Sequence, residues 1–376
     1  MKIILSSLFI FSSLLLFLTS CSNNDSETKV ERIISNPKYG TLQNSASAPF
    51  EFELLDSVSI QLPNDFILSR ITNLATDQNG NYYFMDKAQS KLISVSSDGS
   101  LRWMTGEKGT GPGDFENVWD ILILNNSILV SNINSSRLDY FDFEGNFIKS
   151  IPMTKEISFS SIEGITESGN LVVSGPRWGS FGHHIFIVKP ESDSLTVINS
   201  FEIDETNGIK IPENFTAKSE INVIDDQIIT GSIHNYSFTI SNLEGEKIKT
   251  INRDFDKIVR PGMFVSGNSS TMNSFGMVLP PFKIDNNLYL ASAIWPTNVS
   301  DPDEFTKKSA TGSSLRAEFE NSIDLFDSNW NLLYSLESEG YDPKMGRIRF
   351  VKDGYIFTAN TDPSPTIYRY KISTQN

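Results

Sequence analysis

Residues 109–151 read GTGPGDFENVWDILILNNSILVSNINSSRLDYFDFEGNFIKSI. A glycine-rich loop opens the stretch, and four short runs rich in β-branched and aromatic residues follow it. Asn, Ser and Gly-containing turns separate these runs, the last turn being Glu144-Gly145. Short apolar runs bounded by turn residues are typical of β-strands. The stretch therefore predicts a four-stranded antiparallel sheet with strands at 118–124, 128–132, 137–143 and 146–151.

Similar units recur along the chain. A sheet of this size cannot bury both of its faces alone, so copies of it are expected beside it. The turn Asp98-Gly99 lies about 46 residues before Glu144-Gly145, and Glu244-Gly245 closes a later copy. A period in the forties with four strands per unit is typical of a β-propeller blade.

Five complete units and one incomplete unit follow from this pattern. The last unit has three strands, whereas residues 52–62 form a strand-like run without a unit of its own. We expect this run to close the last blade, because closure removes an open sheet edge. The predicted fold class is all-β, a six-bladed β-propeller of four-stranded antiparallel blades whose N-terminal strand closes the last blade. The expected units are 71–104, 118–151, 162–201, 221–251, 277–336 and 347–372.

The N-terminus predicts export and a lipid anchor. Lys2 precedes an apolar run, Ile3–Leu18, that is typical of a signal peptide and short for a membrane span. Leu18-Thr19-Ser20-Cys21 then resembles the lipobox of bacterial lipoproteins, in which the Cys is acylated and becomes the new N-terminus. Cys21 is the only cysteine, so no intrachain disulfide can form. The predicted organisation is a signal peptide at 1–20, a flexible polar tether at 21–48 and the propeller at 49–376.

Two motifs carry a family resemblance. The loop Gly109, Gly111, Gly113 and Phe115, together with the run from Arg137 to Gly145, resembles the NHL propeller repeat. With the lipobox and tether, the chain resembles the 6-bladed β-propeller lipoproteins of Bacteroidetes, which have NHL-like or TolB-like repeats. This resemblance implies a lipid anchor in the bacterial outer membrane, with the propeller facing the periplasm or the cell surface. It implies no activity, because most members have none assigned. The acids of Ser22–Glu27 resemble a surface-export tract, although a plain tether explains them nearly as well.

Charge narrows the class of partner. The chain has 31 Lys and Arg against 46 Asp and Glu, a formal net charge of -15. Nucleic acids are bound by clustered basic residues, so we expect no nucleic-acid partner. The predicted partners are the membrane, through the lipid on Cys21, and a protein, peptide or glycan ligand. The propeller itself is expected to be monomeric.

The residues that could carry catalysis are few. His184 and His234 are weak candidates for a channel-bound Ca²⁺ or Zn²⁺, since a zinc site wants about three converging ligands. His183 is adjacent to His184, so the two would face opposite sides of a strand. The alternative is that these histidines line the channel or the surface and bind no metal. We predict no catalytic residue and no cofactor. The acid pairs Asp225/Asp226, Asp254/Asp256 and Asp301/Asp303 are interpreted as turn and insert residues, because none has the spacing of a calcium loop.

Loops at the channel mouth offer a binding surface. The candidate ligand-binding residues are Trp119, Arg177, Trp178 and Trp295, since Trp and Arg are enriched at binding hot spots. The insert 296–314 is a second candidate surface, or a lid without a role. The predicted function is a lipid-anchored recognition module of the cell envelope. The alternative is a metal-dependent hydrolase or lyase with a divalent cation in the central channel.

Overall fold

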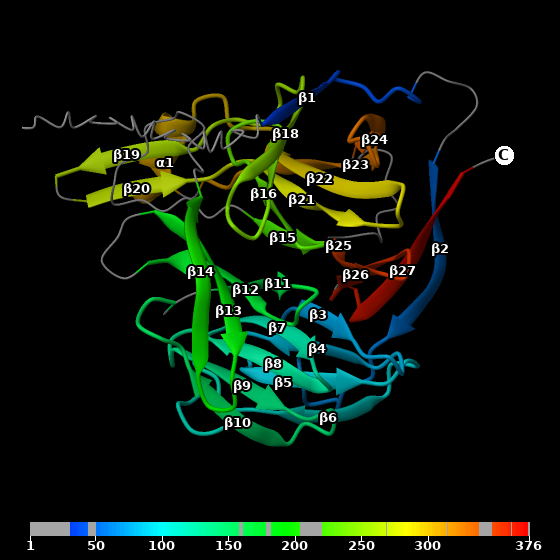
Figure 1. Ribbon diagram of the computed structural model, residues 1–376, viewed down its shortest axis with the longest axis vertical. Helices are drawn as coiled ribbons and strands as arrows, with labels where there is room; N and C mark the ends of the chain where they lie inside the picture. Colours follow the sequence, from blue (N-terminus) through cyan, green and yellow to red (C-terminus); the bar gives the residue numbers. More distant parts are fainter. Residues whose placement is uncertain are drawn as a thin grey trace, which may run out of the picture. The chain divides into compact units, whose positions relative to one another are not determined.

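Six sheets, each built on four antiparallel strands, form a β-propeller in the computed structural model (Figure 1). The predicted fold class and the count of six blades are confirmed. The structure describes residues 31–43, 50–157, 161–177, 182–203, 220–267, 269–313, 315–337, 348–361 and 363–374. All of them belong to one compact unit, Glu31–Asn376.

Blades one to three follow one another along the chain. Blade one consists of β3 (Thr72–Thr76), β4 (Tyr82–Asp86), β5 (Lys91–Val95) and β6 (Leu101–Thr105). Blade two consists of β7 (Val118–Leu124), β8 (Ser127–Asn132), β9 (Arg137–Phe141) and β10 (Phe147–Pro152). Blade three consists of β11 (Ser161–Ile165), β12 (Leu171–Pro176), β13 (His183–Pro190) and β14 (Leu195–Ile203).

Blades four to six complete the ring. Blade four consists of β15 (Ile221–Ile224), β16 (Gln227–Gly231), β17 (Ser237–Ser241) and β18 (Lys247–Arg253). Blade five consists of β21 (Met277–Lys283), β22 (Leu288–Pro296), β23 (Phe319–Asp327) and β24 (Leu332–Glu337). Blade six consists of β25 (Ile348–Lys352), β26 (Tyr355–Asn360), β27 (Thr366–Thr374) and β2 (Phe50–Ser59).

Blade six joins the two ends of the chain, as the sequence predicts. Strand β2 pairs antiparallel with β27, from Phe50 opposite Thr374 to Ser59 opposite Thr366. The strand begins two residues earlier and ends three residues earlier than the predicted run 52–62. In Figure 1 the blue β2 lies beside the red β27.

The innermost strands form a closed ring around the channel. Each of β3, β7, β11, β15, β21 and β25 contacts the next, and β25 contacts β3. A separate hydrophobic cluster fills each of the six interfaces between neighbouring blades. Burial between blades therefore holds the ring together, as the hydrophobic effect requires of faces that cannot be buried within one sheet.

The glycine-rich loop joins blades one and two. Phe115 is buried in the core between these blades, with its ring 5.7 Å from that of Phe141. Arg137 donates from Nη1 to the Thr110 carbonyl and from Nη2 to the Gly111 carbonyl, both at 2.7 Å. The loop is thus an inter-blade turn whose carbonyls are held by an arginine of the third strand, and Phe115 fixes the turn to the core between the two blades.

Part of the expected tether lies on the propeller. Strand β1 (Arg32–Asn36) pairs in parallel with β18, as a fifth strand on the outer edge of blade four. The backbone then follows blade five, where the Thr41 and Leu42 amides donate to the Leu332 and Leu333 carbonyls. Contact with the propeller thus begins at residue 31, well before residue 49. The remainder of 21–48 lies outside the described residues.

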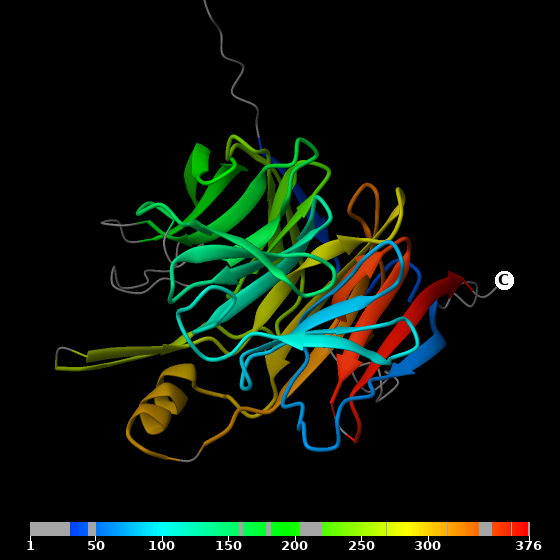
Figure 2. The same cartoon turned by 90° about the horizontal axis from the view of Figure 1, so that it is seen from below.

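Two insertions form a joint projection. After blade four, β19 (Gly262–Ser266) and β20 (Ser269–Asn273) form a two-stranded hairpin. Within blade five, the insert 296–314 forms the helix α1 (Pro302–Ala310), which packs on β19. Figure 2 shows the hairpin and the helix extending together from the blades. A two-stranded hairpin is marginal alone, so the contact with α1 supplies the buried face that it needs.

Candidate functional site

The two ends of the propeller differ in their connections. Because the strands of a blade alternate in direction, one end carries the starts of all first strands, the links between second and third strands, and the links between blades. This end, called here the entry face, carries the long described connections 60–71, 106–117 and 254–276, together with the insert between β22 and β23. Within the described residues, the turns between strands of one blade at the opposite end are short, such as 77–81, 125–126 and 225–226. Long loops on a rigid scaffold are where binding residues usually lie, so the entry face is the candidate functional end.

A cavity of about 620 Å³ lies at the starts of the innermost strands, and residues of all six blades line it. Its acidic and basic residues are segregated around the ring, and between them the lining residues of blade five are all apolar. Blades two and three and the start of blade four contribute an acidic arc, which consists of Asp120, Glu163 and Glu220. Blade five contributes an apolar arc, which consists of Leu279, Pro280 and Phe282. Blades six and one contribute a basic arc, which consists of Arg349, Arg70 and Lys87.

Bulges aim side chains into this cavity. Five of the six innermost strands lose regular pairing where they line it, with register shifts at 72–75, 118–121, 162–164, 279–282 and 348–350. The residues within these irregular segments that line the cavity include Asn73, Asp120, Glu163, Pro280 and Arg349. A β-bulge redirects a side chain and is found preferentially beside functional sites. The same distortion in five blades therefore marks the cavity as a built feature of the propeller.

Asp120 links three blades. Its Oδ1 accepts from Asn73 Nδ2 in blade one, and its Oδ2 accepts from the Ile162 amide in blade three, both at 3.1 Å. Asn73 has a φ of 52°, in the left-handed region that Asn tolerates better than most residues. The neighbouring Glu163 accepts a hydrogen bond from the Ser174 hydroxyl of its own blade. These contacts hold the acidic arc in place before any ligand arrives.

The hydroxyl groups of the cavity wall are committed to structure. Ser69 donates from its hydroxyl and its amide to Asp86, and the Thr72 hydroxyl donates to the Met85 carbonyl at 3.0 Å. The described wall thus presents no Ser or Thr hydroxyl held by a histidine base, the arrangement that activates a hydroxyl nucleophile in a Ser–His pair. The charged groups of both signs in the wall can bind and orient a charged ligand.

Among the predicted aromatic site residues, the structure describes the side chain of Trp295, and this side chain does not line the cavity. Trp295 is buried between blades four and five, donates to Glu320 Oε2 at 3.1 Å and packs against Phe255. It is therefore a core residue and is not available as a contact for a ligand. Arg177 is exposed at the entry face, with its Nη2 4.0 Å from Glu156 Oε1. Trp178 and the side chain of Trp119 lie outside the described part of the chain, so their predicted roles stay predictions.

The histidines are buried in two different blades. His184 stacks on Phe186, which packs in the core shared with blade two, so His184 faces away from blade four. His234 lies in the link between β16 and β17 of blade four. His183 is the member of the pair on the side of blade four, since Ile185 and Ile187 pack there. Among the described residues, no group of three or more His, Cys, Asp or Glu could hold a metal ion.

The acid pairs have structural partners. Asp225 accepts from Lys283 of blade five, while Asp226 accepts from the Glu167 amide of blade three at 2.7 Å. Asp301 caps α1, and Asp303 forms an ion pair with Arg260. Asp254 and Asp256 contact the N-terminal segment. The interpretation of these pairs as turn and insert residues agrees with these contacts.

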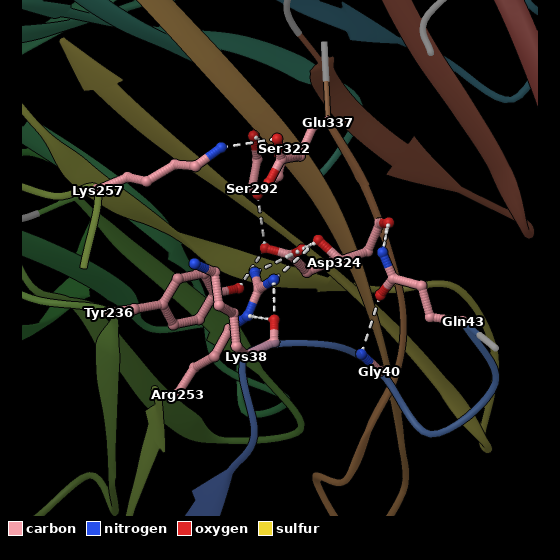
Figure 3. Close-up of polar contacts among 11 residues, drawn as sticks. Lys38, Gly40, Gln43, Tyr236, Arg253, Lys257, Ser292, Ser322, Asp324 and Glu337 are labelled. Atoms are coloured by element: carbon pink, nitrogen blue, oxygen red, sulfur yellow. Dashed lines mark hydrogen bonds and ion pairs between the residues drawn. The ribbon is translucent and has the colours of Figure 1, made fainter. Parts of the chain in front are cut away.

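A buried polar network lies between blades four and five, away from the cavity (Figure 3). Arg253 Nη1 donates to Asp324 Oδ1 at 3.0 Å, and the side chains of both residues are almost completely buried. Tyr236 donates to Asp324 Oδ2 at 2.6 Å. Burial and then the Asp324 charge raise the pKa of Tyr236 well above its usual range. The charges of Arg253 and Asp324 neutralise each other within the network. We therefore interpret the network as a structural link between the two blades.

No known family model matches the chain, and no curated protein matches it. Solved structures show the fold. A Bacteroides fragilis protein described as exported is 13% identical with a TM-score of 0.55, and the match covers 91% of this chain and 99% of that one. A DUF4221 family member from Bacteroides vulgatus is 11% identical with a TM-score of 0.52, over 87% of this chain and 99% of that one. Within the described residues, no helix is long and apolar enough to span a membrane.

Proposed function

We propose that the protein is a recognition module of the bacterial cell envelope that binds its ligand in the cavity at the entry face. The observation that carries this proposal is the set of five strand irregularities that direct side chains from five blades into one cavity. A fold that needed only stability would keep these strands regular, because each bulge leaves a residue unpaired in the ladder.

The size of the cavity suits part of a larger ligand or the whole of a small one. Its volume of about 620 Å³ lies within the range of small-molecule sites. A protein, peptide or glycan would insert a terminus, a loop or a terminal sugar, and the long connections of the entry face would contact the rest. Arg177 and the projection made by β19, β20 and α1 lie on this face.

The location belongs to the same proposal. The lipobox-like run Leu18-Thr19-Ser20-Cys21 supports acylation at Cys21 and an anchor in the outer membrane. A structural neighbour described as exported supports an envelope location. The metal-dependent alternative has no comparable support, because the two histidines on which it rested lie in different blades and His184 faces away from blade four.

The test uses a matched pair of substitutions in blade one. Ala88 lines the cavity and is exposed, so Ala88→Trp fills the cavity mouth without entering the core. Gln78 lies in the exposed turn at the opposite end of the same blade, so Gln78→Trp is the control. The mature proteins are screened for binding to peptide and glycan arrays and to intact envelope fractions.

We expect Ala88→Trp to weaken binding at least tenfold, while Gln78→Trp binds like the wild type. Equal binding by wild type and Ala88→Trp, with both proteins folded by circular dichroism, would show that the cavity is not the site.

A further inference from the structure

We infer that the cavity takes a zwitterionic ligand of the short-peptide class, with a cationic group at the acidic arc and a carboxylate at the basic arc. This inference rests on the proposed function and specifies the ligand of the same site. The observation behind it is the order of the three arcs around one ring. The carboxylates come from consecutive blades, the cations come from the two blades that follow the apolar arc, and the charges are not interspersed.

The separation of charge creates a field across the cavity. Clefts with low-dielectric walls focus such fields, and the interaction between charges is stronger there than in water. A ligand with one ammonium and one carboxylate is aligned by this field. A polyanion would meet the acidic arc unfavourably, and a polycation would meet the basic arc unfavourably.

A neutral glycan fits this wall less well. It would displace water from charged groups of both signs and return only neutral hydrogen bonds, and desolvating charge without compensation is costly. The apolar arc between the two charged arcs adds a surface for aliphatic or aromatic side chains. A peptide of a few residues with free termini combines these three features.

The side chains need not be free of other contacts to serve this ligand. Asp120 already accepts from Asn73 and from the Ile162 amide. A carboxylate offers about four acceptor positions, so a structural hydrogen bond to it does not by itself exclude a ligand ammonium. The hydrogen bond from Ser174 to Glu163 likewise fixes the carboxylate in place, and preorganised groups lose less entropy on binding.

The experiment compares four pools of tripeptides on the mature wild-type protein by equilibrium dialysis with mass-spectrometric readout. One pool has free termini, one is N-acetylated, one is C-amidated and one is blocked at both ends. We expect the free pool to bind at least tenfold more tightly than either singly blocked pool, with the doubly blocked pool weakest. This comparison needs no variant and so does not depend on the folding of a mutant.

Two substitutions test which arc binds the peptide ammonium and which arc binds its carboxylate. Glu163→Gln is expected to weaken binding of the pool with free termini about tenfold. It should also remove most of the loss of affinity caused by N-acetylation, while the loss caused by C-amidation persists. Arg349→Gln is expected to weaken binding of the free pool by a similar factor and to remove most of the effect of C-amidation, while the effect of N-acetylation persists. Glu167→Gln, which removes an exposed carboxylate from the turn at the opposite end of blade three, is the control and should leave all four affinities unchanged.

The outcomes separate this inference from the proposed function. Equal binding of the four pools, with all binding abolished by Ala88→Trp, overturns the zwitterion and leaves the cavity as the site. Failure of every pool, while a ligand of another class binds in an Ala88→Trp-sensitive manner, overturns it in the same way. Peptide binding that Ala88→Trp leaves intact overturns both.

Discussion

Arg253 and Asp324 form a buried ion pair that ties the N-terminal segment to two blades. The distance from Nη1 to Oδ1 is 3.0 Å, and the two side chains are 1% and 0% exposed. Arg253 also donates from Nε and Nη2 to the Lys38 carbonyl, at 3.0 and 2.6 Å. One guanidinium at the end of β18 therefore joins blade four, blade five and the segment that follows β1.

Arg253→Leu leaves a buried carboxylate without its cation. Removing one partner of a buried pair costs about 3–5 kcal/mol. We expect the free energy of unfolding to fall by that amount in urea titrations. The double variant Arg253→Leu/Asp324→Leu is the matched control, because it removes the carboxylate that the single variant leaves unpaired. It should recover part of the loss and not all of it, since the Tyr236, Ser322 and Ser335 hydroxyls then lose their acceptor. A single variant as stable as the wild type would mean that the pair contributes nothing.

Two glycines with the same backbone conformation should respond differently to Ala. Gly145 and Gly169 have φ values of 84° and 82°, and each closes a turn by donating its amide to the carbonyl three residues earlier. A Cβ at Gly145 would lie 2.7 Å from the Trp103 ring, whereas a Cβ at Gly169 meets nothing within 4 Å. Gly169→Ala should lose about 1–2 kcal/mol from the left-handed backbone alone. Gly145→Ala should lose about 1–3 kcal/mol more than Gly169→Ala, because its Cβ overpacks the Trp103 ring. Thermal unfolding measures both losses, and equal losses for the two variants would contradict the close approach at Gly145.

Trp330 occupies the turn position that glycine holds in blades one, two and four. Its φ is 68°, and its ring is buried and stacked 4.4 Å from that of Tyr289. Trp330→Gly relieves about 1–2 kcal/mol of backbone strain but loses about 3–5 kcal/mol of packing. We therefore expect a net loss of stability in urea unfolding. A more stable variant would show that strain dominates at this turn.

The projection should loosen in acid. Arg260, and then the Met263 amide, lower the pKa of Asp303 from 3.8 to about 2. Since the folded pKa is the lower one, this stabilisation is present above pH 3.8 and is lost as the pH falls through 2. The NMR shift of the Met263 amide, which donates to Asp303 Oδ1 at 2.8 Å, should titrate with a midpoint near 2. A midpoint at the ordinary value would mean that the ion pair does not persist in solution.

Much of the fold could be predicted from local chemistry. Turn pairs such as Asp98-Gly99 and short alternating runs identify the blades, and the unpaired run after Phe52 identifies the closing strand. Strand β1 could not be predicted, because Arg32–Asn36 is short and polar in context and is fixed by distant groups such as Trp330 and Leu332.

The cavity was missed although the sequence carried a signal for it. The first strand of several blades has a polar residue inside an apolar run: Asn73, Asp120, Glu163, Asn222 and Arg349. Aligning the blades on their first strands would have brought these positions together at one end of the channel. Which of them protrude depends on register shifts, and those follow from pairing between strands and not from local propensity.

The candidate aromatic residues show the limit of residue type as a guide. Tryptophan is a residue type common at binding hot spots, but Trp295 is buried between two blades. Its burial depends on the neighbouring blade and so could not be predicted from the residue type.

Entry of the ligand into the cavity at the entry face can be tested by site-specific photocrosslinking on intact cells. A photoreactive amino acid replaces Ala88 in one protein and Gln78 in another, so that the two ends of blade one are compared. We expect a crosslinked adduct of defined mass from position 88 and none from position 78. An adduct from position 78 with none from position 88 would place recognition at the opposite end of the propeller and contradict the account.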